Sequence, residues 1–216
     1  MLPRMEIDTP HGPARAHLHE VDAPRGILVL GHGAGGGVGA PDLVAATRAA
    51  NGEGFGVVLV EQPYRVAGRR SVAPARQLDA AWEAVLAALP FEGLPVVTGG
   101  RSSGARVACR TAAATGAAGV LCLAFPLVTP RGASRQEELD AVEVPMLVVQ
   151  GRSDRFGMPK PGPRREVVQV DGDHGLKKDL AAVGAAVGAF LRLIAQEAGA
   201  SSRRSASKRS PSTRQS

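Results

Sequence analysis

Short apolar segments alternate with longer mixed segments along most of the chain. The short segments are rich in Val, Leu and Ile and are bounded by Gly, Pro or Asp, which is typical of buried strands. The longer segments have the length of helices, and several begin near a proline or end near a glycine. Strands are predicted at 26–31, 55–60, 94–98, 118–125, 144–150 and 166–170, and helices at 41–52, 74–89, 105–113, 134–142 and 176–198.

This alternation predicts an α/β fold with a doubly wound, mostly parallel sheet. Residues 4–8 and 14–21 differ, because the second segment alternates small or apolar residues with polar ones. Such alternation is typical of a half-exposed strand, so we expect the two segments to form an antiparallel ribbon at the sheet edge. The loops after position 103 are too short to hold a large lid.

Composition and charge separate the chain into a body and a tail. The sequence of 216 residues is 44% hydrophobic, 21% charged and 3% aromatic, which predicts one domain over 1–198 with a core of Val, Leu and Ala. The net charge is +6, and residues 201–216 carry five basic side chains and no acidic one. We therefore expect 199–216 to be a disordered basic tail that is solubilising or weakly attracted to polyanions, with no specific nucleic-acid partner.

Cysteine and histidine usage further narrows the class of protein to which the chain can belong. Two cysteines, Cys109 and Cys122, are too few for a disulfide framework, and we expect both to be core residues. His17 and His19 share a face of one predicted strand, but a third metal ligand is missing. Residues 1–8 lack the apolar region of a signal peptide, and we expect no apolar run of the roughly 18 residues that cross a membrane. These features predict a cytoplasmic protein without a metal site or a membrane contact, and they leave its oligomeric state open.

The segment 99–104, GGRSSG, lies between a predicted strand and a predicted helix. In that context the pattern G-x-S-x-G forms a nucleophile elbow, a sharp turn that exposes its serine at the carboxyl edge of the sheet. Gly100 and Gly104 would remove side chains where backbone segments come close together. Ser102 is therefore the candidate nucleophile. The alternative is a glycine-rich turn that holds an ordinary serine.

A second glycine-rich segment, HGAGGGVGA at 32–40, follows the first buried strand. Gly31, Gly33 and Gly36 match the spacing of a dinucleotide fingerprint, but the helix begins only near position 41. The His-Gly pair directly after a strand favours an oxyanion loop, in which backbone N–H groups face a substrate carbonyl. The candidates for contact with an acyl group are the N–H groups of Ala34 and Ser103 as oxyanion donors, and Gly33, Gly35 and Arg101 as substrate-binding residues.

The candidate catalytic base and acid are identified by their order along the chain after Ser102. His174 is the only histidine beyond Ser102, and it follows the last predicted strand. Asp154 follows the preceding strand and would hold the imidazole in the tautomer that accepts the serine proton. Asp171 and Asp173 are alternatives to Asp154. Because they lie so close to His174 in sequence, their carboxylates would reach the ring nitrogen that faces away from Ser102 only with difficulty.

Five segments carry a resemblance to known proteins: HGAGG at 32–36, QPY at 62–64, GGRSSGAR at 99–106, VQGRSD at 149–154 and GDH at 172–174. With these segments the chain resembles the α/β-hydrolase superfamily in its small, capless, dienelactone-hydrolase-like form. Within it, the chain resembles the family of the testis-expressed hydrolase-like protein and of a subunit of an animal chromatin complex. Ser102 stands where dienelactone hydrolases have a cysteine, and Glu61 stands where relatives often have an aspartate.

The resemblance implies a serine hydrolase that cleaves an ester or related acyl bond of a small molecule, and we expect it to need no metal or organic cofactor. Two other functions remain open: a non-catalytic interaction module with the same fold, and an acyltransferase that uses the same residues. We expect Arg101 to pair with Glu61. Contact between Arg101 and an anionic group of the substrate is the alternative.

Overall fold

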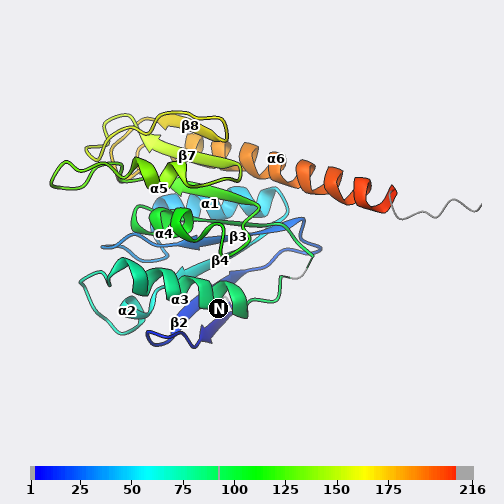
Figure 1. Ribbon diagram of the computed structural model, residues 1–216, viewed down its shortest axis with the longest axis horizontal. Coiled ribbons are helices and arrows are strands. Elements are labelled where there is room, and N and C mark those ends of the chain that lie inside the picture. The colour runs from blue at the N-terminus through cyan, green and yellow to red at the C-terminus, as the bar shows by residue number, and fades with distance from the viewer. Residues whose placement is uncertain (1–2, 92, 208–216) are drawn as a thin grey trace, which may run out of the picture.

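The computed structural model describes residues 3–91 and 93–207. An eight-stranded sheet runs through them in the order β1-β2-β4-β3-β5-β6-β7-β8 (Figure 1). The pairs β1–β2 and β2–β4 are antiparallel, and every pair from β4 to β8 is parallel, as the sequence predicts. The strands are β1 (Arg4–Ile7), β2 (Ala14–His19), β3 (Gly26–Gly31), β4 (Phe55–Glu61), β5 (Val96–Arg101), β6 (Gly119–Leu123), β7 (Met146–Gly151) and β8 (Arg165–Val170).

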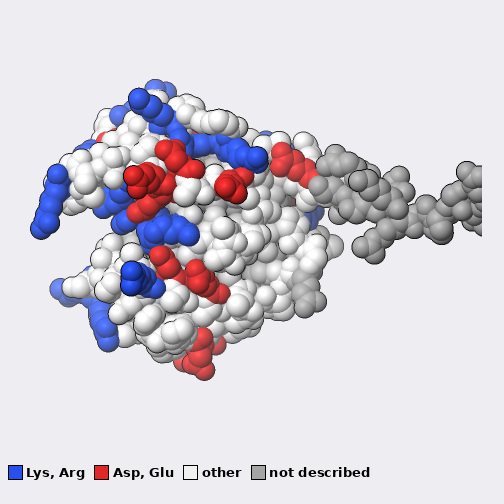
Figure 2. Space-filling model, viewed as in Figure 1, with Lys and Arg blue, Asp and Glu red and all other residues white. Residues whose placement is uncertain are grey.

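Helices cover both faces of the sheet, so the core has two layers. Residues of β3 alternate between them: Leu28 and Leu30 pack with α1 and α6, whereas Ile27 and Val29 pack with α3. Acidic and basic side chains are interspersed on the outer surface of α3, α4 and α5 (Figure 2). The helices are α1 (Pro41–Gly52), α2 (Pro63–Val66), α3 (Ala75–Ala88), α4 (Ser103–Thr111), α5 (Gln136–Asp140) and α6 (Leu180–Ser207).

The last helix differs from its prediction at both ends. α6 begins at Leu180, four residues after the expected start, because the carboxylate of Asp179 accepts the N–H of Ala182 and caps the first turn. At the other end α6 runs to Ser207, although the sequence predicts disorder from position 199. The Ala, Ser and Arg residues there are compatible with a helix, and Gly199 does not stop it. Residues 208–216 of the expected tail lie outside the described residues, and the division into domain and tail stays a prediction.

One expectation about membranes is also wrong. The segment Leu180–Ala200 of α6 is long enough and apolar enough to cross a membrane by length and composition alone. Its apolar character has a different use in the fold, since Val183, Val187, Leu191 and Ile194 pack into the core beside α1. About a third of the segment, 33%, is buried inside the protein, and a single helix of this kind is weak evidence for a membrane.

Candidate active site

A sharp turn between β5 and α4 presents Ser102 at the carboxyl edge of the sheet. Ser102 has a φ of +52°, in the left-handed region that non-glycine residues rarely occupy. Its N–H donates to the carbonyl oxygen of Leu123 on the neighbouring strand at 2.9 Å, which holds the turn. A Cβ atom on Gly100 or on Gly104 would overlap the carbonyl oxygen of Gly31, so both positions require glycine. The strained serine and the two glycines match the elbow that the sequence predicts.

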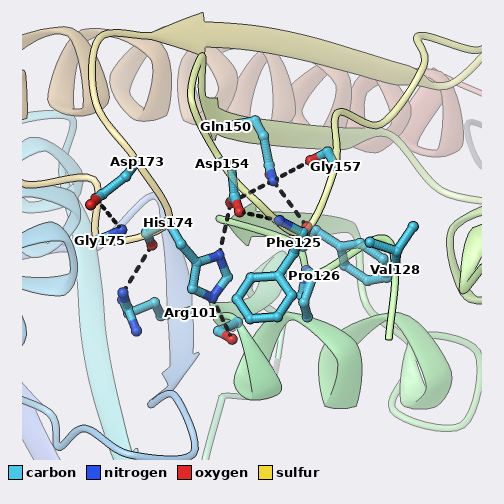
Figure 3. A network of polar contacts seen from close by, with 12 residues as sticks. Arg101, Phe125, Pro126, Val128, Gln150, Asp154, Gly157, Asp173, His174 and Gly175 are labelled. Atoms are coloured by element: carbon cyan, nitrogen blue, oxygen red, sulfur yellow. Dashed lines mark hydrogen bonds and ion pairs between the residues drawn. The ribbon is translucent and has the colours of Figure 1, made fainter. Parts of the chain in front are cut away.

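His174 connects Ser102 to Asp154 in one chain of hydrogen bonds (Figure 3). The Nε2 atom of His174 lies 2.9 Å from Ser102 Oγ, and its Nδ1 atom lies 2.8 Å from Asp154 Oδ2. A carboxylate only accepts, so Nδ1 carries the hydrogen and Nε2 accepts the hydrogen of the serine hydroxyl. The structure thus brings together the three side chains that the sequence selects.

The carboxylate of Asp154 is held from two sides by groups that the sequence analysis missed. Gln150 Nε2 donates to Oδ2 at 2.8 Å, and the N–H of Phe156 donates to Oδ1 at 2.9 Å. The Asp154 side chain is 0% exposed, so these donors replace water. The Phe156 ring also packs edge-on against the His174 ring, with centroids 4.6 Å apart. Gln150 lies within the VQGRSD segment, one of the five that carry the family resemblance. That position was the only feature of the sequence that could have indicated a role for Gln150.

The alternative acids are engaged elsewhere. Asp171 pairs with Arg152, and both side chains are 61% exposed. Asp173 Oδ1 accepts the N–H of Gly175 at 2.8 Å, within its own loop. Neither carboxylate bonds to the His174 ring, so Asp154 alone among the three has the geometry of an orienting acid.

The loop after β3 lies beside Ser102, as expected of an oxyanion loop. A Cβ atom on Gly33 would come within 3.7 Å of Ser102 Cβ. The carbonyl oxygen of Ala34 accepts the hydroxyl of Tyr64 at 3.2 Å, which ties this loop to α2. Ser103 is the first residue of α4, so its N–H has no partner within the helix. Gly35 is exposed with open space around its Cα, and its expected contact with substrate stays a prediction.

His32 supports this loop from inside the protein. Its Nδ1 lies 2.8 Å from the carbonyl oxygen of Gly33, and its Nε2 accepts the N–H of Gln62 at 3.2 Å. These partners fix a neutral tautomer with the hydrogen on Nδ1. Burial lowers the pKa of His32, although the hydrogen bond to Gly33 opposes the shift. In the sequence His32 only marks the start of the loop, and in the structure it supports the loop.

The expected pair between Arg101 and Glu61 is wrong. Glu61 Oε2 lies 2.9 Å from His17 Nε2 and 3.8 Å from Arg15 Nη1, because β2 pairs with β4 so that Arg15 lies opposite Glu61 and His17 lies two residues further along the same strand. Arg101 lies two strands away on β5, and its Nε donates to Asp42 Oδ2 at 3.0 Å. Asp42 comes from the first turn of α1 and is fully buried.

Comparisons with known proteins agree with this fold. A family model described as an alpha/beta hydrolase domain matches residues 24–198. The chain belongs to the α/β-hydrolase family. No curated protein matches it. A dienelactone hydrolase is among the solved structures that share its fold, and the nearer resemblance to the testis-expressed family stays a prediction.

Solved structures of other α/β hydrolases have the same fold at low sequence identity. XC6422 from Xanthomonas campestris, described as a serine hydrolase without lid, is 21% identical with a TM-score of 0.74, covering 88% of this chain and 94% of its own. Est1E from Butyrivibrio proteoclasticus is 16% identical with a TM-score of 0.71, covering 88% and 98%. Dienelactone hydrolase from Anabaena variabilis is 15% identical with a TM-score of 0.71, covering 89% and 97%.

Proposed function

We propose that this α/β hydrolase cleaves a carboxylic ester or related acyl bond of a small molecule, with Ser102 as nucleophile, His174 as base and Asp154 as orienting acid. The observation that carries the proposal is the unbroken chain of hydrogen bonds from Ser102 through His174 to Asp154. A serine hydroxyl is a weak nucleophile until a base accepts its proton, and this arrangement supplies that base.

The reaction would proceed through an acyl-enzyme. Ser102 Oγ attacks the carbonyl carbon of the ester while His174 Nε2 takes the hydroxyl proton, and the carbonyl oxygen becomes an oxyanion. The N–H groups of Ser103 and Ala34 would donate to that oxyanion. The intermediate then expels the alcohol, which leaves with the proton from Nε2. Water attacks the acyl-enzyme in the same way, and the acid and free Ser102 are released.

The surroundings of Ser102 favour small or exposed acyl groups. Between β5 and α6 the described residues hold only α4, α5 and strands of the central sheet, so no separate lid domain is inserted there. The buried cysteines Cys109 and Cys122 are free thiols, which suits the reducing cytoplasm that we propose as the location. A small-molecule substrate, with no nucleic acid and no membrane, is part of the same proposal.

Ester turnover tests the proposal. A series of p-nitrophenyl esters of increasing acyl length is offered to the wild type and to Ser102→Ala at equal concentrations. We expect turnover by the wild type on the shortest esters and none by the variant, which should fold equally well. Equal rates for the two proteins would remove Ser102 as the nucleophile. A folded wild type that turns over no ester would favour a non-catalytic role for the fold.

A further inference from the structure

The guanidinium group of Arg101 joins separate segments around Ser102. Its Nε donates to Asp42 Oδ2 at 3.0 Å. Its Nη2 donates to the backbone carbonyl oxygen of His174 at 2.9 Å (Figure 3). Its Nη1 lies so close to the loop after β3 that a Cβ atom on Gly33 would be 3.0 Å away. Arg101 therefore contacts α1, the oxyanion loop and the His174 loop from one position at the end of β5.

Asp42 has both oxygens occupied, which fixes the orientation of Arg101. Its Oδ1 accepts the N–H of Leu43 at 3.0 Å, and its Oδ2 accepts from Arg101. The Asp42 side chain is 0% exposed and the Arg101 side chain 19% exposed. Burial raises the pKa of Asp42, and the positive charge of Arg101 opposes that shift. A buried carboxylate of this kind needs its cation, so the two residues form one unit.

His174 needs such a contact because it lies in a loop. Residues 171–179 between β8 and α6 have no regular structure. Within this loop Asp173 bonds only to nearby backbone: its side chain accepts from Gly175 and its carbonyl oxygen from Leu176. The carbonyl oxygen of Gly172 accepts the N–H of Ser153 at 2.9 Å, which ties the loop to the segment after β7. The bond from Arg101 ties the His174 backbone to the strand that carries Ser102. Arg101 thus adds a backbone contact to the hydrogen bonds that the His174 ring makes with Ser102 and Asp154.

We propose that the Arg101–Asp42 pair positions His174 for proton transfer from Ser102, and that Arg101 is not a binding group for an anionic substrate. This inference rests on the proposed hydrolase function. Arg101 acts through the backbone of His174 and touches no reacting atom. A displacement of the imidazole by about 1 Å would lower the rate of chemistry by about 10²-fold while leaving the binding of a small ester unaffected.

Two variants separate positioning from charge and from stability. Arg101→Lys keeps a positive charge for Asp42, but a single ammonium group lacks the two-nitrogen geometry that reaches both Asp42 and His174. The double variant Arg101→Met with Asp42→Asn removes both charges and leaves no unpaired buried carboxylate. The matched control is Arg110→Met with Asp79→Asn. That pair joins α4 to α3 through bonds of 2.6 and 2.8 Å, with side chains 20% and 21% exposed, and Arg110 Nη1 also lies 3.4 Å from Glu138 Oε2 of α5.

Kinetics on a neutral and an anionic ester give the first result. On p-nitrophenyl acetate we expect both Arg101 variants to lose about 10²-fold in kcat at unchanged KM, and the control pair to keep the wild-type kcat. The same loss in kcat is expected on mono-p-nitrophenyl succinate. A wild-type kcat in Arg101→Lys overturns the proposal. A rise in KM confined to the succinate ester also overturns it, because that result would assign Arg101 to substrate binding.

The hydrogen on His174 Nδ1 gives a second result that does not depend on turnover. Its bond to Asp154 should produce a downfield proton resonance in the wild type and in the control pair, and the resonance should shift or disappear in both Arg101 variants. If the wild type shows this resonance but cleaves no ester, the proposed hydrolase function fails, and the resonance alone tests whether Arg101 positions His174. An unchanged resonance in both Arg101 variants would then overturn the positioning role of Arg101.

Discussion

Asp154 differs from the neighbouring aspartates in how completely its carboxylate is enclosed. It is 0% exposed, whereas the side chain of Asp171 is 61% exposed. Gln150 and Phe156 hold the two oxygens of Asp154, and His174 completes the set. A carboxylate fixed in this way selects one tautomer of the imidazole, which is what the proposed base needs.

Substitution of the aspartates should therefore have unequal effects. We expect Asp154→Asn to lose about 10⁴-fold in kcat, because an amide can present an N–H to His174 Nδ1 and favour the wrong tautomer. Asp173→Asn should keep nearly all activity, since its side chain bonds only within its loop. Rates on p-nitrophenyl acetate compare the two variants directly. An active Asp154→Asn beside an inactive Asp173→Asn would show that the acid is wrongly assigned.

His32 should make stability depend on pH. Burial lowers its pKa below the ordinary value of 6.5, so the unfolded chain binds the proton more readily than the folded one. The stability contributed by neutral His32 is then fully present above that value and is lost as the pH falls through it toward the folded pKa. We expect the difference in free energy of unfolding between the wild type and His32→Asn to shrink between about pH 8 and pH 5. Urea denaturation at several pH values measures this difference in free energy of unfolding. A difference that stays constant with pH would contradict the neutral state of His32.

Sequence patterns located the site residues better than their partners. Ser102, Asp154 and His174 each follow a strand, and parallel strands carry such residues to a common edge of the sheet. The partner of Arg101 was missed because it depends on where α1 begins relative to β5. The position of α1 relative to β5 is set by the packing of the whole sheet, and no local sequence pattern predicts it.

At the scale of elements, the elbow depends on close backbone contact between β3, β5 and α4. A Cβ atom on Gly100 or Gly104 would overlap the backbone of Gly31, and one on Gly31 would lie 3.3 Å from the Cα of Gly104. Apolar periodicity predicts the strands and helices around this contact, because burial on one or both faces sets the pattern. The ends of α6 were less predictable, since the Asp179 cap depends on side-chain geometry and the helix continues through polar residues.

Two alanine substitutions test the elbow against an ordinary helical glycine. Gly104→Ala should destabilise the protein by about 3 kcal/mol or more, because the new methyl group would overlap the backbone of Gly31. Gly184→Ala lies inside α6, where the nearest atom would be 3.8 Å from the new Cβ. It should stabilise the protein by about 0.5–1 kcal/mol. Thermal unfolding of both variants measures these changes in stability. Equal stability of Gly104→Ala and the wild type would mean that β3 and α4 are farther apart than in the structure.

For the whole molecule, the site is confined to residues that precede α6. Ser102, Asp154 and His174 all come before its first residue, Leu180. The family match ends at position 198, and the basic residues from 201 onward lie beyond it. Activity and any attraction to polyanions should therefore reside in separate parts of the chain.

Truncation after Gly199 should separate these two properties. We expect unchanged turnover of p-nitrophenyl acetate, because no proposed catalytic group is removed. Retention on heparin should fall, and the retention of the full chain should weaken as salt rises, since five basic residues are involved. A truncated protein that unfolds or loses turnover would show that the segment beyond Gly199 is part of the folded domain.

The central claim is that Ser102 is a nucleophile activated by His174, and covalent labelling tests it most directly. A fluorophosphonate reacts with an activated serine and leaves a stable adduct that intact mass and peptide mapping can locate. We predict one adduct per chain, mapped to Ser102, with labelling abolished in Ser102→Ala and slowed by about 10⁴-fold or more in His174→Ala. Labelling that maps elsewhere, or that proceeds equally well without His174, would contradict the account.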